Sequence, residues 1–291
     1  MTLAPYFLKD APSLIEHLLP VQKISAESYK EQMAGSGKAL TALGNYWKGL
    51  KPLILNKACI LGALLPYHKE SEAKDLEIFE LLMGIANSSV AIRLGEIKPE
   101  IVAFKVSNLS TEKYFKTSKK IPSNYVFYRD IKVDLPSKTP FNIQDYTFEI
   151  KNKKTGEIKE ISLTLSWASN LSSEDKFEAQ GRALPYETHK ENISDKKALR
   201  PEEIEDDKLY SHVWKRVNAH LGTNAFSIPE LINELGIARF GHNPKVADTF
   251  CGSGQIPFEA ARLGCDVYAS DLNPIACMLT WGAFNIVGIT K

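Results

Sequence analysis

A glycine-containing turn that follows one aspartate and precedes another is the part of the sequence best suited to bind a ligand. Residues 246–254 read VADTFCGSG. The first two residues, both apolar, predict the start of a strand, and Gly252 and Gly254 allow the backbone to turn tightly and to approach a ligand closely. Residues 257–263 then repeat apolar side chains at helical spacing. We therefore expect a nucleoside-binding site at the carboxyl end of a strand and at the N-terminus of a helix.

The charges around this turn distinguish between two kinds of nucleotide ligand. A dinucleotide fingerprint has three glycines, but Pro257 holds the third glycine position here, and Asp248 stands just before the turn. A carboxylate at this place would repel a pyrophosphate and attract a ligand that carries an ammonium and a sulfonium. Asp271 follows at the end of the next expected strand, where its carboxylate would accept hydrogen bonds from the hydroxyls of a ribose. The two aspartates predict S-adenosylmethionine as the cofactor; the alternative is a helix-capping turn in an ordinary α/β domain.

A longer stretch around the turn resembles a known family. Residues 248–274 read DTFCGSGQIPFEAARLGCDVYASDLNP, which is similar to the cofactor-binding region of adenine-specific DNA methyltransferases. The closest resemblance is to the large methyltransferases of phage-defence islands, a restriction-modification setting, which open with an N-terminal domain of unknown function. Two N-terminal segments extend this resemblance, one over residues 18–28 and one over residues 46–53, which read YWKGLKPL.

This resemblance implies roles for six residues around the turn. It places the methionine part of the cofactor at the first carboxylate and at the backbone of the two glycines, with an aromatic ring that shapes the pocket. The second carboxylate takes the ribose hydroxyls, and the leucine after it packs against the adenine. The implied cofactor-binding residues are Asp248, Phe250, Gly252, Gly254, Asp271 and Leu272.

An aromatic and basic segment near the N-terminus is a candidate for nucleic-acid contact. Trp47, Lys48 and Lys51 combine a stacking ring with positive charge, which is typical of a contact to a single strand or a flipped base. The alternative is the start of a helix whose long side chains cover a core. The net charge of +1 and the pI near 7.6 give no global signature of a nucleic-acid-binding protein. Contact with DNA is therefore expected only from local patches.

The resemblance also implies a catalytic motif that these 291 residues do not contain. Methyl transfer to an exocyclic amine in this family uses an Asn/Asp/Ser-Pro-Pro-aromatic tetrapeptide, and the sequence has 15 prolines but no Pro-Pro pair. We therefore assign no catalytic residue and expect the N-terminal portion of a DNA adenine-N6 methyltransferase, inactive by itself. In the complete enzyme the target base would be flipped out and its amino nitrogen would attack the methyl group directly. The expected partners are DNA and either the remaining part of the methyltransferase or a complementing subunit.

Two other functions remain open on the sequence. An RNA guanine-N2 methyltransferase has a cofactor turn that also reads Asp-x-x-Cys-Gly-Ser-Gly, so a fragment of such an enzyme is one alternative. The other is a non-catalytic subunit that binds the cofactor or recognises DNA, which the absence of a Pro-Pro pair favours.

Hydrophobic periodicity divides the chain into two regions. We expect a family-specific region of mixed α+β structure over residues 1–205 and the incomplete start of an S-adenosylmethionine-binding methyltransferase domain over residues 206–291. The first region is expected to be helical to about residue 95, rich in strands over about 101–167, and a polar linker over about 169–208. The expected fold class is α/β with a partial Rossmann-like sheet at the C-terminus. The first strand of such a partial sheet would have an unpaired edge, which invites pairing with another chain.

Composition excludes several classes of protein. The four cysteines are too scattered for a zinc site, so we expect no metal and reduced thiols. No stretch approaches 18 consecutive apolar residues, and the first ten residues do not have the pattern of a signal peptide. We therefore expect a cytoplasmic protein that does not contact the membrane.

Overall fold

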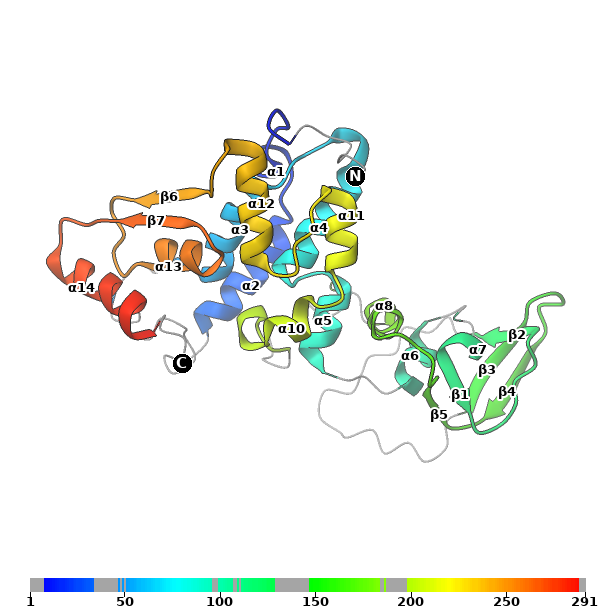
Figure 1. Ribbon diagram of the computed structural model, residues 1–291. Helices are drawn as coiled ribbons and strands as arrows, with labels where there is room; N and C mark the ends of the chain where they lie inside the picture. Colours follow the sequence, from blue (N-terminus) through cyan, green and yellow to red (C-terminus); the bar gives the residue numbers. More distant parts are fainter. Residues whose placement is uncertain are drawn as a thin grey trace. The chain divides into compact units, whose positions relative to one another are not determined.

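The chain has mixed α/β structure with small sheets and divides into two compact units (Figure 1). The first unit contains Met1–Ala86 and Lys190–Lys291, and the second contains Asn87–His189. The structure, a computed structural model, describes residues 8–33, 47, 49, 51–95, 99–106, 109, 111–128, 147–183, 186 and 198–287.

The first unit is mainly helical and contains a parallel pair of strands. Its elements are α1 (Leu14–His17), α2 (Val21–Met33), α3 (Leu53–Leu64), η3 (Lys69–Ser71), α4 (Glu72–Met83), η5 (Pro201–Glu203), α10 (Asp206–Tyr210), α11 (Trp214–Leu221), α12 (Ile228–Phe240), β6 (Lys245–Asp248), α13 (Gln255–Arg262), β7 (Asp266–Ala269), α14 (Pro274–Gly282) and the π-helical turn η6 (Ala283–Val287). Helix α3 packs against α1, α2, α4, α12 and α13. Because α3 is apolar on most of its circumference, it occupies the core of this unit.

The start of α3 is set by a proline and by a carboxylate from α2. Pro52 stands at the N-cap and offers no side-chain cap. Instead, Glu31 on α2 accepts hydrogen bonds from the backbone N–H of Leu53 at 2.8 Å and of Ile54 at 3.1 Å. The carboxylate satisfies two free donors at the positive end of the helix dipole. Helix α2 therefore fixes where α3 begins. A proline at a first helical turn predicts a helix at Pro52, and the structure confirms it.

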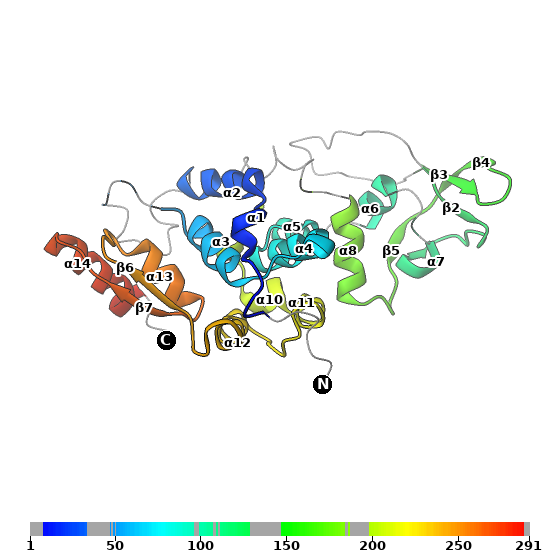
Figure 2. The same ribbon diagram turned by 90° about the horizontal axis from the view of Figure 1, so that it is seen from above.

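The C-terminal elements form a strand, helix and strand in which the two strands are parallel. Strands β6 and β7 pair in register from Lys245 opposite Asp266 to Asp248 opposite Ala269. Helix α13 packs against both strands and lies along one face of the pair (Figure 1, Figure 2). Among the described residues this sheet has two strands, and the ring of Tyr268 is 62% exposed on it. Parallel strands are normally covered on both faces, so this pair presents an uncovered surface.

The second unit combines short helices with two antiparallel sheets. Its elements are α5 (Asn87–Leu94), α6 (Pro99–Lys105), α7 (Thr111–Tyr114), β1 (Phe115–Thr117), β2 (Tyr125–Phe127), β3 (Thr147–Asn152), β4 (Ile158–Ser162), β5 (Leu165–Trp167) and α8 (Ser173–Ala183). Strand β1 pairs with β5, and the second sheet has the order β2-β3-β4. Alternating side chains over residues 146–150 and 158–165, with a turn at residues 153–156, predict a hairpin, and the β3–β4 pairing confirms it.

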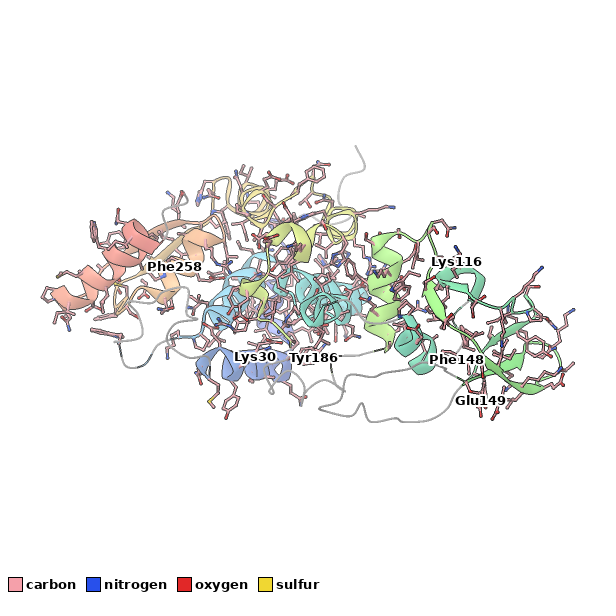
Figure 3. All side chains as sticks on the ribbon, turned by 90° about the horizontal axis from the view of Figure 1, so that it is seen from below. Lys30, Lys116, Phe148, Glu149, Tyr186 and Phe258 are labelled. Atoms are coloured by element: carbon pink, nitrogen blue, oxygen red, sulfur yellow. The ribbon has the colours of Figure 1, made fainter. Side chains whose placement is uncertain are left out.

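Alternation along β3 separates the core of the second unit from solvent. Phe148 is buried and packs on Phe127 with ring centroids 5.0 Å apart, whereas the next residue, Glu149, points to the other face of the sheet (Figure 3). Phe115 joins this cluster by stacking on Trp167 at 5.4 Å. The unit therefore has its own aromatic core, distinct from that of the first unit.

The expected polar linker over residues 169–208 is wrong for the part that forms α8. Ser172 accepts a hydrogen bond from the backbone N–H of Asp175 at 3.1 Å and so helps to start this helix. The buried stripe of α8 includes Ala179, Gly181 and Ala183, which pack on α5. A β-carbon on Gly181 would lie 2.9 Å from the backbone of Asn87, so the helices approach closely. Hydrophobic periodicity misses this stripe because its members are small.

The capping pattern at residues 227–230 predicts a helix that ends near Gly236, and this predicted end is also wrong. Helix α12 continues to Phe240 and ends at Gly241, which has a φ of 78°. Gly236 lies within the helix, and the ring of Pro244 occupies the place that a side chain at this position would need. The glycine therefore permits a close contact and does not end the helix.

The compact units differ from the expected division at residue 205. Their boundaries fall after residues 86 and 189, so residues from both ends of the chain share one unit. The physical reason is the packing of α3 on α13, which joins the N-terminal segment to the helix after the glycine turn. Leu53, Phe258 and Ala283 form a buried cluster at this junction.

Candidate functional site

The expected strand, turn and helix are present at residues 245–262. Strand β6 ends at Asp248 and α13 begins at Gln255. Gly252 and Gly254 have φ values of 53° and 79°, which residues with a β-carbon rarely adopt. The backbone N–H of Gly254 donates a hydrogen bond to the carbonyl oxygen of Cys251 at 2.7 Å and closes the turn. The local backbone around the glycines is therefore confirmed.

The second aspartate reaches this turn from the next strand. Asp271 follows β7, and its Oδ2 accepts a hydrogen bond from the backbone N–H of Gly252 at 2.9 Å. Its Oδ1 accepts one from the N–H of Asn273 at 2.8 Å. The N–H groups of Asn273, Gly252 and Leu272 lower the pKa of the Asp271 carboxyl because they stabilise its charged form. The structure therefore brings together the glycine turn and a carboxylate whose pKa is lowered.

The other predicted cofactor residues lie at the same end of the two strands. Asp248 is half-buried, and its Oδ1 accepts a hydrogen bond from the backbone N–H of Phe250 at 3.1 Å. The side chains of Phe250 and Leu272 are 75% and 90% exposed. All six predicted positions thus flank the two strand ends, with the two apolar side chains facing solvent.

Helix α14 supplies a residue that the sequence did not single out. Thr280 is buried, and its Oγ1 donates a hydrogen bond to the carbonyl oxygen of Gly252 at 3.2 Å. The same Oγ1 lies 3.3 Å from Sγ of Cys251. A polar residue in an otherwise apolar helical stretch is the signal that could have identified Thr280. The turn is therefore held on one side by Asp271 and on the other by α14.

Of the three residues expected to contact nucleic acid, one lies against the turn. A β-carbon built on Gly252 would lie 2.6 Å from Nε1 of Trp47, so the indole packs directly on this glycine. Trp47 is half-buried and Lys51 is exposed. Lys48 lies outside the described residues. The structure therefore places Trp47 beside the predicted cofactor residues.

Residues 18–82 match a protein family described as "Protein of unknown function (DUF1156)". This match contains both N-terminal segments of the resemblance, and it contains α3, which packs on α13. No curated protein and no solved structure matches the chain.

A cavity of about 260 Å³ lies elsewhere in the first unit. It is lined by Asp206, Asp207, Tyr210, Ser211, Trp214, Phe226, Ser227 and Ile228. None of the six predicted cofactor residues lines it. This cavity is therefore separate from the two strand ends.

A buried polar cluster lies under the helix that follows the turn. Lys57 on α3 is 3% exposed, and its Nζ donates a hydrogen bond to Oη of Tyr210 at 2.7 Å. On α13, Arg262 forms two hydrogen bonds with the fully buried carboxylate of Glu259, at 2.7 and 2.8 Å. Burial and the nearby charge of Arg262 lower the pKa of Lys57 to about 7, although Glu259, Asp206 and Glu202 act in the opposite direction. This cluster connects α3, α10 and α13.

The low pKa of Lys57 makes the stability of the first unit depend on pH. In the unfolded chain Lys57 keeps its ordinary value of 10.5, so between pH 7 and 10.5 the unfolded state binds a proton that the folded state does not. The free energy of unfolding must therefore rise as pH rises through this range. We expect Lys57→Met to remove about 2 kcal/mol of this increase between pH 7 and pH 9, measured by urea denaturation at several pH values.

The slope of the free energy of unfolding with pH, and not its value at one pH, tests this prediction. The loss of the hydrogen bond to Tyr210 changes the free energy of unfolding of Lys57→Met by a similar amount at each pH in this range. Lys23→Met is the matched control because Lys23 pairs with Glu80 at 2.7 Å outside the buried cluster. Parallel pH profiles for wild type and Lys57→Met would contradict a Lys57 that is neutral in the folded state.

The described residues give no indication of a metal centre or a membrane span. No group of three or more His, Cys, Asp or Glu side chains among them is arranged to hold a metal ion. No helix among them has the length and apolar character needed to cross a membrane. All four cysteines are free thiols.

Proposed function

We propose that the two strand ends bind S-adenosylmethionine as the cofactor site of a DNA adenine-N6 methyltransferase. The observation that carries this proposal is the hydrogen bond between Asp271 and the N–H of Gly252, because it places the acidic residue of the second strand at the glycine turn of the first. Asp271 has further lone pairs that can accept hydrogen bonds from the ribose hydroxyls. The choice of DNA adenine as the substrate rests on the resemblance of residues 248–274.

The charges at the strand ends support this cofactor over a dinucleotide. Asp248 and Asp271 both stand at the carboxyl ends of the paired strands, next to one turn. Two carboxylates make the local potential negative, so the sulfonium and ammonium of S-adenosylmethionine are attracted and a pyrophosphate is repelled. The exposed ring of Phe250 and the exposed aliphatic side chain of Leu272 offer apolar surface for the adenosine.

Within this proposal the chain binds the cofactor and another polypeptide segment supplies the catalytic motif. The sequence has no Pro-Pro pair, and among the described residues β6 and β7 form a two-stranded parallel pair that α13 covers on one face. Several large apolar side chains near them are more than half exposed: Tyr268, Leu272, Ile275, Met278 and Trp281. Surfaces of this kind mark contacts with other protein. Protection of Trp281 from a soluble fluorescence quencher when the complementing polypeptide is added would measure that contact.

Calorimetric titration of the 291-residue chain tests the cofactor assignment. S-adenosylmethionine is expected to bind with a measurable heat, whereas NAD at the same concentration is expected to give none, since its pyrophosphate would lie beside two carboxylates. Binding of NAD in preference to S-adenosylmethionine would overturn the proposal. Titration in high salt is an internal control, because screening should weaken the discrimination between the two ligands.

A further inference from the structure

Trp47 lies against Gly252, the residue whose backbone N–H donates a hydrogen bond to Asp271. A β-carbon on Gly252 would lie 2.6 Å from Nε1, 3.2 Å from Cδ1 and 3.3 Å from Cε2 of the indole. All three atoms belong to the five-membered ring, so this ring covers the Cα of Gly252. The absence of a side chain at Gly252 is therefore what allows the indole to reach the turn.

The backbone groups of Gly252 are engaged elsewhere and leave the Cα side to the indole. Its N–H donates to Asp271 at 2.9 Å, and its carbonyl oxygen accepts from Thr280 at 3.2 Å. An aromatic ring and an ionised carboxylate thus border the same glycine. A ligand whose hydroxyls donate hydrogen bonds to the remaining lone pairs of this carboxylate would lie within reach of the ring.

Helix α3, which follows Trp47 in the sequence, is anchored at its start. Helix α3 begins at Leu53, where Glu31 of α2 caps it. The same Leu53 packs with Phe258 of α13, the helix that starts at the glycine turn. Packing of α3 on α13 therefore holds the start of α3 next to the helix that follows the turn.

We infer that Trp47 forms an aromatic wall of the cofactor site, so that bound S-adenosylmethionine packs against its indole; this inference rests on the proposed function. Both parts of this ligand suit such a wall, because adenine stacks on aromatic rings and a sulfonium is attracted to their faces. The segment that matches the family of unknown function therefore contributes a residue to cofactor binding. Trp47 then acts on the cofactor side of the reaction and not as a contact to a nucleic-acid single strand or a flipped base.

Three variants of the 291-residue chain test this inference by calorimetry with S-adenosylmethionine. Trp47→Ala is expected to weaken binding roughly 10-fold, as for the loss of one stacking ring, whereas Trp47→Phe retains a ring and stays within about 3-fold of wild type. Tyr29→Ala is the matched control, because Tyr29 is an aromatic residue on α2 that is 59% exposed. It is expected to bind like wild type.

Fluorescence decides the question where Trp47→Ala is poorly folded. Wild type is expected to change its tryptophan emission when S-adenosylmethionine binds, and Trp47→Phe is expected to bind the cofactor without that change. Equal affinity of wild type and Trp47→Ala would overturn the role of Trp47 while leaving the cofactor site in place. The same would follow if Trp47→Phe showed the emission change of wild type on binding. Failure of wild type to bind S-adenosylmethionine at all would instead overturn the proposed function.

Discussion

Replacing Asp271 with alanine is expected to weaken the binding of S-adenosylmethionine roughly 10- to 100-fold, since a charged acceptor is lost from the ribose hydroxyls. The carboxylate is held in place by the N–H groups of Gly252 and Asn273, so it is already oriented in the free protein. Its lowered pKa keeps it ionised over the whole neutral range. The loss of affinity should therefore be the same at pH 6 and at pH 8, measured by calorimetry.

Two further substitutions separate the loss of the Asp271 charge from the loss of its hydrogen bonds and from general effects of changing an aspartate near β7. Asp271→Asn retains an oxygen that can accept from Gly252, so we expect an affinity between those of wild type and Asp271→Ala. Asp266→Ala is the matched control because Asp266 stands at the opposite end of β7, where it accepts a hydrogen bond from Asn243 at 3.1 Å. The assignment of Asp271 to the ribose would be wrong if Asp266→Ala and Asp271→Ala had the same affinity for the cofactor.

The part of the site that could be predicted from the sequence is the part made by neighbours along the chain. The strand before Asp248, the turn at Gly252 and Gly254, and the helix after it follow from apolar runs and from the freedom of glycine. The approach of Asp271 to the turn follows from the same βαβ arrangement, in which parallel strands end at one edge. The fold class could be predicted only as mixed α/β, because the signal for each strand is local.

The contacts that could not be predicted join segments far apart in the sequence. Trp47 lies against Gly252 and α3 packs on α13, and no periodicity in either segment encodes these pairings. Thr280 meets the turn because α14 folds back after Asn273, whose side chain accepts a hydrogen bond from the N–H of Ile275 at 3.0 Å and caps this helix. In both cases the sequence indicates a helix but not the surface on which it packs.

Small residues explain the remaining differences from expectation. Gly181 in α8 and Gly236 in α12 lie where another segment approaches too closely for a side chain, namely the backbone near Asn87 and the ring of Pro244. Glycine in a sequence is first interpreted as a helix end or a loop, since its helix propensity is low. Its role in close packing depends on a partner that only the folded structure identifies.

Gly254→Ala is expected to lower the free energy of unfolding by about 2–4 kcal/mol. The φ of 79° at Gly254 strains any residue with a β-carbon, and that carbon would lie 2.7 Å from Oγ1 and 3.0 Å from Cγ2 of Thr280. Thr280 cannot move away freely, because its Oγ1 is hydrogen-bonded to the carbonyl oxygen of Gly252. Chemical denaturation of wild type and variant at one pH measures the difference.

Gly241→Ala isolates the backbone part of this effect, because Gly241 has a φ of 78° and no atom within 4 Å of the place where a β-carbon would stand. We expect it to cost about 1 kcal/mol. The double variant Gly254→Ala with Thr280→Ala should recover part of the loss, since the two nearest atoms are then removed. Equal losses for Gly254→Ala and Gly241→Ala would show that α14 does not press on the turn.

The two substitutions at the site should also differ in what they change. Asp271→Ala removes a ligand contact, so it is expected to reduce affinity more than stability. Gly254→Ala displaces α14 from the turn and, through the hydrogen bond between Asp271 and the N–H of Asn273, disturbs the carboxylate as well, so it is expected to reduce both. Loss of stability in Gly254→Ala with full retention of affinity for S-adenosylmethionine would mean that cofactor binding does not depend on the conformation of this turn.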